Sequence, residues 1–99
     1  MTRVKQLSMN HLVTQREGNI VSDMGNEKVM LNIENGKYYN LGTTGGEMWE
    51  LIAAPIAVSE VVTKIMTQYD VSKEQCEEEV LSFLEHMYEE KLVQVTTQK

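Results

Sequence analysis

A Cys–His nucleophile pair is the first chemistry to consider, and the spacing of these residues argues against it. Cys76 is the single cysteine, and His86 follows it ten residues later. On one helix this separation is about 15 Å, at roughly 1.5 Å per residue, so the two side chains cannot share a proton. His11 lies far away in the sequence, and no His/Cys pair has the spacing of metal ligands. We therefore predict no catalytic residue and no metal.

Two runs of glutamate and a group of glycines are the other candidates for chemistry. Glu77–Glu79 and Glu89–Glu90 are adjacent in sequence, so on a helix their carboxylates point in different directions. We interpret them as a solvated helix face, and a weak attraction for a Lys-rich peptide remains the alternative. Gly42, Gly45 and Gly46 precede a predicted helix, but their spacing fits neither a P-loop nor a dinucleotide fingerprint. They indicate a turn and a helix entry, and no cofactor is expected.

The composition favours a small binding module. With 99 residues, 41% hydrophobic and 24% charged, the chain can form one core but has little material left to enclose a substrate cavity. The net charge of -6 disfavours nucleic acid and an anionic membrane surface as partners. No apolar segment follows Met1–Lys5, and no apolar run approaches the roughly 20 residues of a membrane span. We expect a soluble, cytoplasmic protein.

Alternating and turn-forming residues predict short strands in the first half of the chain. Residues 1–10 are expected to form a flexible arm, residues 11–95 one domain and residues 96–99 a polar tail. Strands are expected at four places, which are residues 11–16, 20–24, 29–33 and 37–41. Asn35-Gly36 predicts a hairpin between the last two of these strands, because both residues tolerate positive φ. On the strand before this turn the apolar face is expected to comprise Val29, Leu31 and Ile33, and on the strand after it Tyr39 and Leu41, with Tyr38 and Asn40 opposite.

Helix signals dominate the second half. Capping boxes at Thr44–Glu47 and Ser72–Gln75 open a first and a third helix, and Ser59 is expected to cap a second between them. The third helix carries an apolar stripe of Cys76, Val80, Phe83, Leu84, Met87 and Leu92. A short strand is expected at residues 92–95. These elements predict an α+β fold of the winged helix-turn-helix type, with a three-stranded antiparallel sheet followed by three helices.

The hairpin places Lys37–Leu41 at the edge of that sheet. An edge strand exposes unpaired amides and carbonyls, which proteins normally protect. This one lacks proline and carries a single charge, so an extended peptide could add to it as a further strand. On these grounds alone, a short edge strand that binds no partner is an equally good interpretation. DNA recognition is not supported, because the third helix carries many glutamates against only Lys73 and Lys91.

The segments Gly36–Gly42 and Met48–Ile52 resemble the pyrroloquinoline quinone biosynthesis protein D family. Members of this family recognise leader peptides of ribosomally made, post-translationally modified peptides. The resemblance spans about residues 20–95, with Gly42 where many members have asparagine. A stand-alone chain of this length is similar to the leader-binding partner of lasso-peptide biosynthesis.

The resemblance implies a three-stranded sheet and three helices that bind the leader as a fourth strand, between Lys37–Leu41 and the helix Lys73–Glu90. It implies that the protein is not an enzyme and presents the precursor to a cysteine leader peptidase and a ring-closing synthetase. Whether Tyr38 or Tyr39 faces the groove stays open, because a shift of one residue exchanges them. Alternatives are a small winged-helix transcriptional regulator and an accessory subunit of a modifying enzyme. The peptide-binding residues implied are Lys37, Tyr38, Tyr39, Asn40, Leu41, Cys76, Glu77, Val80, Phe83, Leu84 and Met87.

Overall fold

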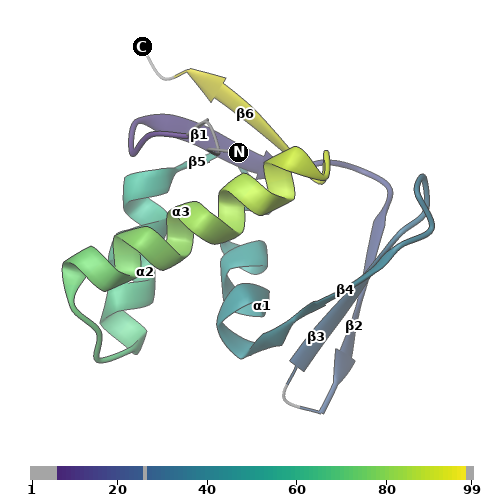
Figure 1. Ribbon diagram of the computed structural model, residues 1–99, viewed down its shortest axis with the longest axis horizontal. Coiled ribbons are helices and arrows are strands. Elements are labelled where there is room, and N and C mark those ends of the chain that lie inside the picture. Colours follow the sequence, from purple (N-terminus) through teal and green to yellow (C-terminus); the bar gives the residue numbers. More distant parts are fainter. Residues whose placement is uncertain (1–6, 26, 98–99) are drawn as a thin grey trace, which may run out of the picture.

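The computed structural model describes residues 7–25 and 27–97 (Figure 1). Its strands are β1 His11–Gln15, β2 Asn19–Met24, β3 Glu27–Asn32, β4 Tyr38–Leu41, β5 Ile56–Ala57 and β6 Val93–Thr97. Its helices are α1 Gly42–Leu51, α2 Val58–Gln68 and α3 Lys73–Glu89. Most of the predicted arm, residues 1–6, and the last two residues of the predicted tail lie outside the described residues. Within the remainder of the arm, Leu7 is buried and the carbonyl of Met9 accepts a hydrogen bond from the Ser59 amide.

The strands form two antiparallel sheets. The predicted three-stranded sheet is present with the order β2-β3-β4, and the α+β fold with three helices is confirmed. A second sheet, with the order β5-β1-β6, joins the first strand to the terminal strand. The terminal strand is β6 at Val93–Thr97, whereas the sequence predicted it at residues 92–95. The sequence did not predict the second sheet, because β5 has only two residues and therefore shows no period.

The side-chain phase of β3 is opposite to the predicted one. Met30 is fully buried and Asn32 is nearly so, whereas Ile33 is 62% exposed and Val29 and Leu31 are half-buried on the outward face. A one-residue shift exchanges the two faces of a strand while its alternation stays the same, so the period alone could not fix the phase. The prediction for β4 is confirmed, since Tyr39 and Leu41 face inward with Met30.

The hairpin turn is longer than predicted. The Asn32 amide donates to the Lys37 carbonyl at 3.0 Å, so four residues, 33–36, connect the strands. The buried Asn32 side chain organises this loop, because its Oδ1 accepts from the Asn35 amide at 2.8 Å. Gly36 has a φ of 71° and Asn35 does not lie in the left-handed region, so only one of the two residues adopts the positive φ that both tolerate. At the far end of the hairpin, Lys28 pairs with Gly42 instead of Leu41, which is a one-residue bulge.

Of the three predicted helix N-caps, only the one that begins α3 is correct. The Ser72 side chain accepts from the Gln75 amide at 3.2 Å and begins α3 as predicted. The capping box at Thr44 is wrong, because α1 begins at Gly42 directly from the bulge and has no side-chain cap. The Ser59 cap is also wrong, because β5 leads straight into α2 at Val58.

The core lies where the helices meet the inner faces of both sheets. α3 packs on α2 and β6, while α1 packs on α2 and β3 (Figure 1). Trp49 of α1 and Ile52, which caps the end of that helix, are buried there together with Val13 of β1 and Leu84 of α3. Among the described residues no helix is long and apolar enough to cross a membrane. β4 lies at one edge of its sheet, and α1, which begins directly after it, packs between this sheet and α2.

Candidate functional site

The outer edge of β4 is open for backbone pairing. β4 is the last strand in the order β2-β3-β4, and the Lys37 carbonyl accepts from Asn32. Backbone-bonded and non-bonded pairs alternate along an antiparallel ladder, so Tyr39, opposite Met30, also directs its backbone groups to β3. The N–H and C=O groups of Tyr38 and Asn40 therefore point to the open edge. These are the groups that an added strand would use.

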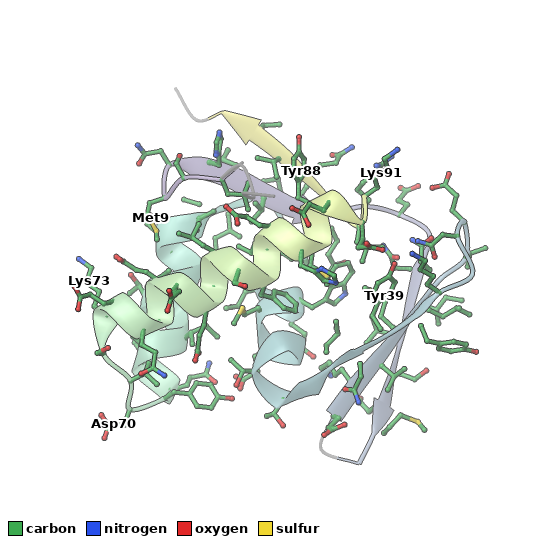
Figure 2. All side chains as sticks on the ribbon, in the orientation of Figure 1. Met9, Tyr39, Asp70, Lys73, Tyr88 and Lys91 are labelled. Atoms are coloured by element: carbon green, nitrogen blue, oxygen red, sulfur yellow. The ribbon has the colours of Figure 1, made fainter. Side chains whose placement is uncertain are left out.

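One side of α3 faces this edge, as two contacts demonstrate. The Tyr39 hydroxyl donates to Glu90 Oε1 at 2.8 Å, near the C-terminal end of the helix (Figure 2). Two turns earlier, the Phe83 ring packs on the start of α1, since a Cβ built on Gly45 would lie 2.9 Å from Phe83 Cε1 and 3.5 Å from Leu41 Cβ. Helical spacing places two further residues on the same side. We call this side the α3 stripe, which consists of Glu79, Phe83, His86 and Glu90.

The other predicted residues of α3 do not line this edge. Cys76, Val80, Leu84 and Met87 are at most 2% exposed and form part of the core. Glu77 faces the opposite side of α3, where it lines a concavity of about 530 Å³ together with Met9 and Val62. The apolar pattern marked the most buried side of the helix, whereas the side that faces β4 lies roughly a quarter turn away. Of the predicted set, the structure brings together Lys37–Leu41 and Phe83.

A polar contact fastens the hairpin to the end of α3. Glu90 Oε1 accepts from the Tyr39 hydroxyl and lies 3.5 Å from Lys37 Nζ. The hydrogen bond from Tyr39, together with the charge of Lys37, lowers the pKa of the Glu90 carboxyl below its usual range. Burial, followed by the bond to Glu90, raises the pKa of Tyr39. At neutral pH the contact therefore joins a neutral phenol to an ionised carboxylate, which is a charge-assisted hydrogen bond.

This contact predicts a specific loss of stability in acid. Because the pKa of Glu90 is lower in the folded state, its stabilisation is present above the unfolded value of about 4.3 and is lost as the pH falls through the folded pKa. We expect the melting temperature to fall less between pH 7 and about pH 3 in Glu90→Gln than in the wild type. The control is Glu89→Gln at the exposed neighbouring position, which should follow the wild type. Equal acid sensitivity of all three proteins would contradict this role for Glu90.

Nucleophilic chemistry at Cys76 is not supported by its surroundings. Its thiol is buried in the core and contacts the Val62 carbonyl oxygen at 3.6 Å. Burial, and then the nearby Glu79 and Glu77 carboxylates, raise the pKa of the Cys76 thiol. A buried, protonated thiol is a poor nucleophile. In the part of the chain that the structure describes, no three His, Cys, Asp or Glu side chains form a group that could hold a metal ion.

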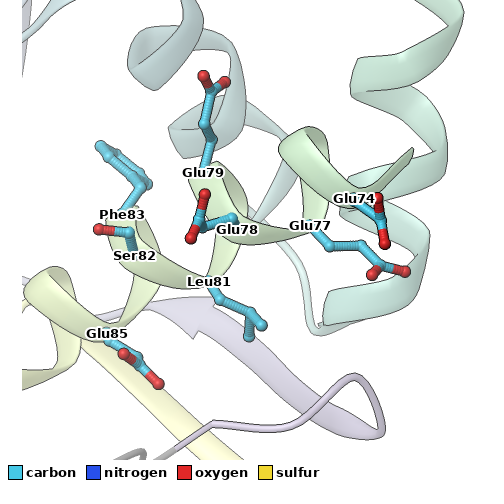
Figure 3. A pocket seen from close by; sticks show the side chains of 8 residues that line it. All are labelled: Glu74, Glu77, Glu78, Glu79, Leu81, Ser82, Phe83 and Glu85. Atoms are coloured by element: carbon cyan, nitrogen blue, oxygen red, sulfur yellow. The ribbon is translucent and has the colours of Figure 1, made fainter. Parts of the chain in front are cut away.

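A surface concavity of about 810 Å³ lies along α3 (Figure 3). Figure 3 shows that Glu79 and Phe83 project to one side of the helix, whereas Leu81, Glu77 and Glu74 project to the other. All of its lining residues belong to α3, and none comes from β4. The candidate site is therefore an open strand edge beside the α3 stripe and not an enclosed pocket.

Comparison with known proteins identifies similar chains. The family model described as coenzyme PQQ synthesis protein D (PqqD) matches residues 27–93. A solved structure of TbiB1 in complex with the TbiA(beta) leader peptide superimposes with a TM-score of 0.73 at 22% sequence identity. The match covers 82% of this chain and 94% of the TbiB1 chain, so the two proteins share the fold. No curated protein sequence matches the chain.

Proposed function

Because the chain belongs to the coenzyme PQQ synthesis protein D family, we propose that it binds the leader segment of a ribosomally made precursor peptide by β-strand addition. The observation that carries this proposal is the open edge of β4, where Tyr38 and Asn40 direct their backbone groups outward. Backbone pairing supplies affinity in this mode, and neighbouring side chains supply specificity. The shared fold with TbiB1, a protein solved in complex with a leader peptide, supports leader binding.

In this mode the leader lies beside β4, and its side chains alternate between two sides. One set faces the α3 stripe, where Phe83 offers an apolar ring and Glu79 a carboxylate. The other set faces outward beside Tyr38, which is 72% exposed. Tyr39 thus belongs to the helix side and Tyr38 to the solvent side. Our revised peptide-binding set is Lys37, Tyr38, Tyr39, Asn40, Leu41, Glu79, Phe83, His86 and Glu90.

We further propose that the protein is a binding module and not an enzyme. The sequence resemblance to the leader-binding partner of lasso-peptide biosynthesis favours delivery of the precursor to a cysteine leader peptidase and a ring-closing synthetase in the cytoplasm. Exposed carboxylates on α3, among them Glu74, Glu78 and Glu79, would repel a phosphate backbone and disfavour nucleic acid as the partner.

Replacing Tyr38 by proline tests the strand edge directly. Proline removes the outward N–H of Tyr38 and leaves the bonds between β4 and β3 in place. One backbone hydrogen bond contributes about 1 kcal/mol, so we expect a roughly fivefold loss of affinity. The measurement is a titration of a fluorescently labelled leader peptide, followed by anisotropy.

The matched control for this substitution is Tyr38→Val, which removes the ring but keeps the N–H and suits a strand. Its affinity should stay within about twofold of the wild type, because the ring points away from α3. Circular dichroism spectra of both variants establish that they are folded. Wild-type affinity in folded Tyr38→Pro would refute strand addition at this edge, and an equal loss in both variants would assign the contact to the ring.

A further inference from the structure

A second open strand edge lies in the sheet β5-β1-β6, which does not contain β4. β6 is the last strand in this order, and it forms the upper rim of the molecule in Figure 1. Within the described residues, no strand pairs with β6 on the side away from β1. An exposed edge of this kind is a template for pairing with another chain.

The register of β1 and β6 shows which backbone groups this edge exposes. The Arg16 amide donates to the Leu92 carbonyl at 3.0 Å, so these two residues form a hydrogen-bonded pair. The Gln15 amide donates to the Ile52 carbonyl at 2.9 Å and therefore points away from β6. Bonded and non-bonded pairs alternate along an antiparallel ladder. The residues of β6 whose backbone groups point to the open edge are therefore Val93, Val95 and Thr97.

The usual protections of an edge strand are missing from β6. Its sequence, VQVTT, contains no proline and no charged residue, it pairs with β1 without a bulge, and four of its five residues are β-branched. The opposite edge of the same sheet is β5, which has only two residues and directly follows Pro55. In the other sheet, the outer strand β2 carries the charged Asp23. Besides β4, the edge of the described structure that is best suited to strand pairing is thus β6.

The sequence of β6 is complementary to itself in an antiparallel pair. A two-fold axis at Val95 would place Val95 opposite the same residue of a second copy, and Val93 opposite Thr97. All of these positions direct their backbone groups to the edge, so the ladder would continue without a break. Gln94 and Thr96 are exposed and would lie opposite each other as a close, non-bonded pair. Because neither is charged, the pairing brings no like charges together on these strands.

We propose that two copies of this chain associate through β6, so that their small sheets join into one sheet of six strands around a two-fold axis. The contact is a strip of five residues, about 17 Å long at roughly 3.4 Å per residue. A stable interface buries about 800 Å² per partner, so this strip forms a weak dimer that dissociates on dilution. β4 belongs to the other sheet, and each copy therefore keeps its own peptide-binding edge. The dimer does not depend on the proposed leader binding.

Replacing both exposed residues of β6 by lysine tests this pairing. Gln94→Lys/Thr96→Lys places lysine opposite lysine at two positions of the proposed dimer and should weaken it roughly tenfold. The measurement is sedimentation equilibrium from about 10 μM to about 1 mM protein. The two lysines also make the net charge of -6 less negative, so repulsion between whole molecules decreases and cannot explain a weaker dimer. Circular dichroism establishes that the variant is folded.

Gln94→Glu/Thr96→Lys is the matched control, because it leaves the net charge unchanged. Around a two-fold axis at Val95 it places glutamate opposite lysine at both positions, and the dimer should be at least as strong as in the wild type. A parallel pair in register would instead place like charges opposite each other in this variant as well. Equal weakening of the two variants would therefore overturn the antiparallel β6 pair.

Leader binding supplies an independent readout. Leader affinity, measured by anisotropy, should stay within about twofold of the wild type in both variants, because Gln94 and Thr96 belong neither to β4 nor to the α3 stripe. Dissociation of the wild-type dimer by saturating leader would assign the β6 edge to the peptide and overturn pairing between copies. A wild-type protein that remains a monomer at about 1 mM also overturns the proposal, whether or not it binds the leader.

Discussion

Replacing Leu84 by alanine is expected to lower the free energy of unfolding by about 3 kcal/mol. Leu84 is fully buried in α3, among the side chains that join this helix to the rest of the core. Truncation removes buried apolar surface and leaves a cavity, which is the costliest common change in a core. A domain of this size has about 5–15 kcal/mol of stability, so the variant should remain folded but unfold at a markedly lower urea concentration.

The same variant distinguishes a core residue from a peptide contact. The sequence pattern placed Leu84 in the wall of the peptide groove, whereas the structure buries it. We therefore expect the folded fraction of Leu84→Ala to bind the leader with wild-type affinity. The control is Leu81→Ala on the same helix, where the side chain is half-buried and the loss should be about 1 kcal/mol. A large loss of leader affinity without loss of stability would return Leu84 to the binding site.

The structural elements were more predictable than the faces that they present. Asn35-Gly36 located the hairpin and Ser72 located the start of α3, because turns and caps depend on local chemistry. The phase of β3 depends on tertiary packing, since Met30 and Ile33 are both apolar and only the fold decides which one is buried. The burial of Asn32 was not predictable from the pattern either, because it depends on hydrogen bonds to the Asn19 side chain and to the Asn35 amide in the turn.

The strand of the candidate site was predictable from the sequence, whereas the helix residues beside it were not. Lys37–Leu41 was predictable as an edge strand because the hairpin makes it the last strand of its sheet. Glu79, His86 and Glu90 were missed because charged and polar residues beside an apolar stripe resemble an ordinary solvated face. Helical spacing from Phe83 could have found them once β4 was known to lie on that side of α3. Which side of α3 lies next to β4 depends on how α1 packs on the sheet. The apolar pattern of α3 gives no information about that packing.

Replacing Gly45 by alanine is expected to weaken leader binding more than tenfold, which is the largest functional effect that the structure predicts. The added Cβ would lie 2.9 Å from Phe83 Cε1, so the half-buried ring must shift to make room. Such overpacking costs about 1–3 kcal/mol, and alanine returns up to about 1 kcal/mol through helix propensity. The net loss of stability is therefore about 0–2 kcal/mol, so the variant should remain folded while the wall of the peptide site is displaced.

The neighbouring glycine provides the matched control for Gly45→Ala. A Cβ on Gly46 would meet Lys28 Cδ, Cγ and Cβ at 2.8, 2.9 and 3.1 Å, so this substitution also overpacks the start of α1, but against β3 and not against Phe83. Gly46→Ala should therefore bind the leader as the wild type does. Phe83→Leu completes a double-mutant cycle with Gly45→Ala, and if Gly45 acts through the ring, the alanine should have little further effect once the ring is gone. Wild-type leader affinity in Gly45→Ala would remove Phe83 from the peptide site and leave the backbone edge of β4 as its main determinant.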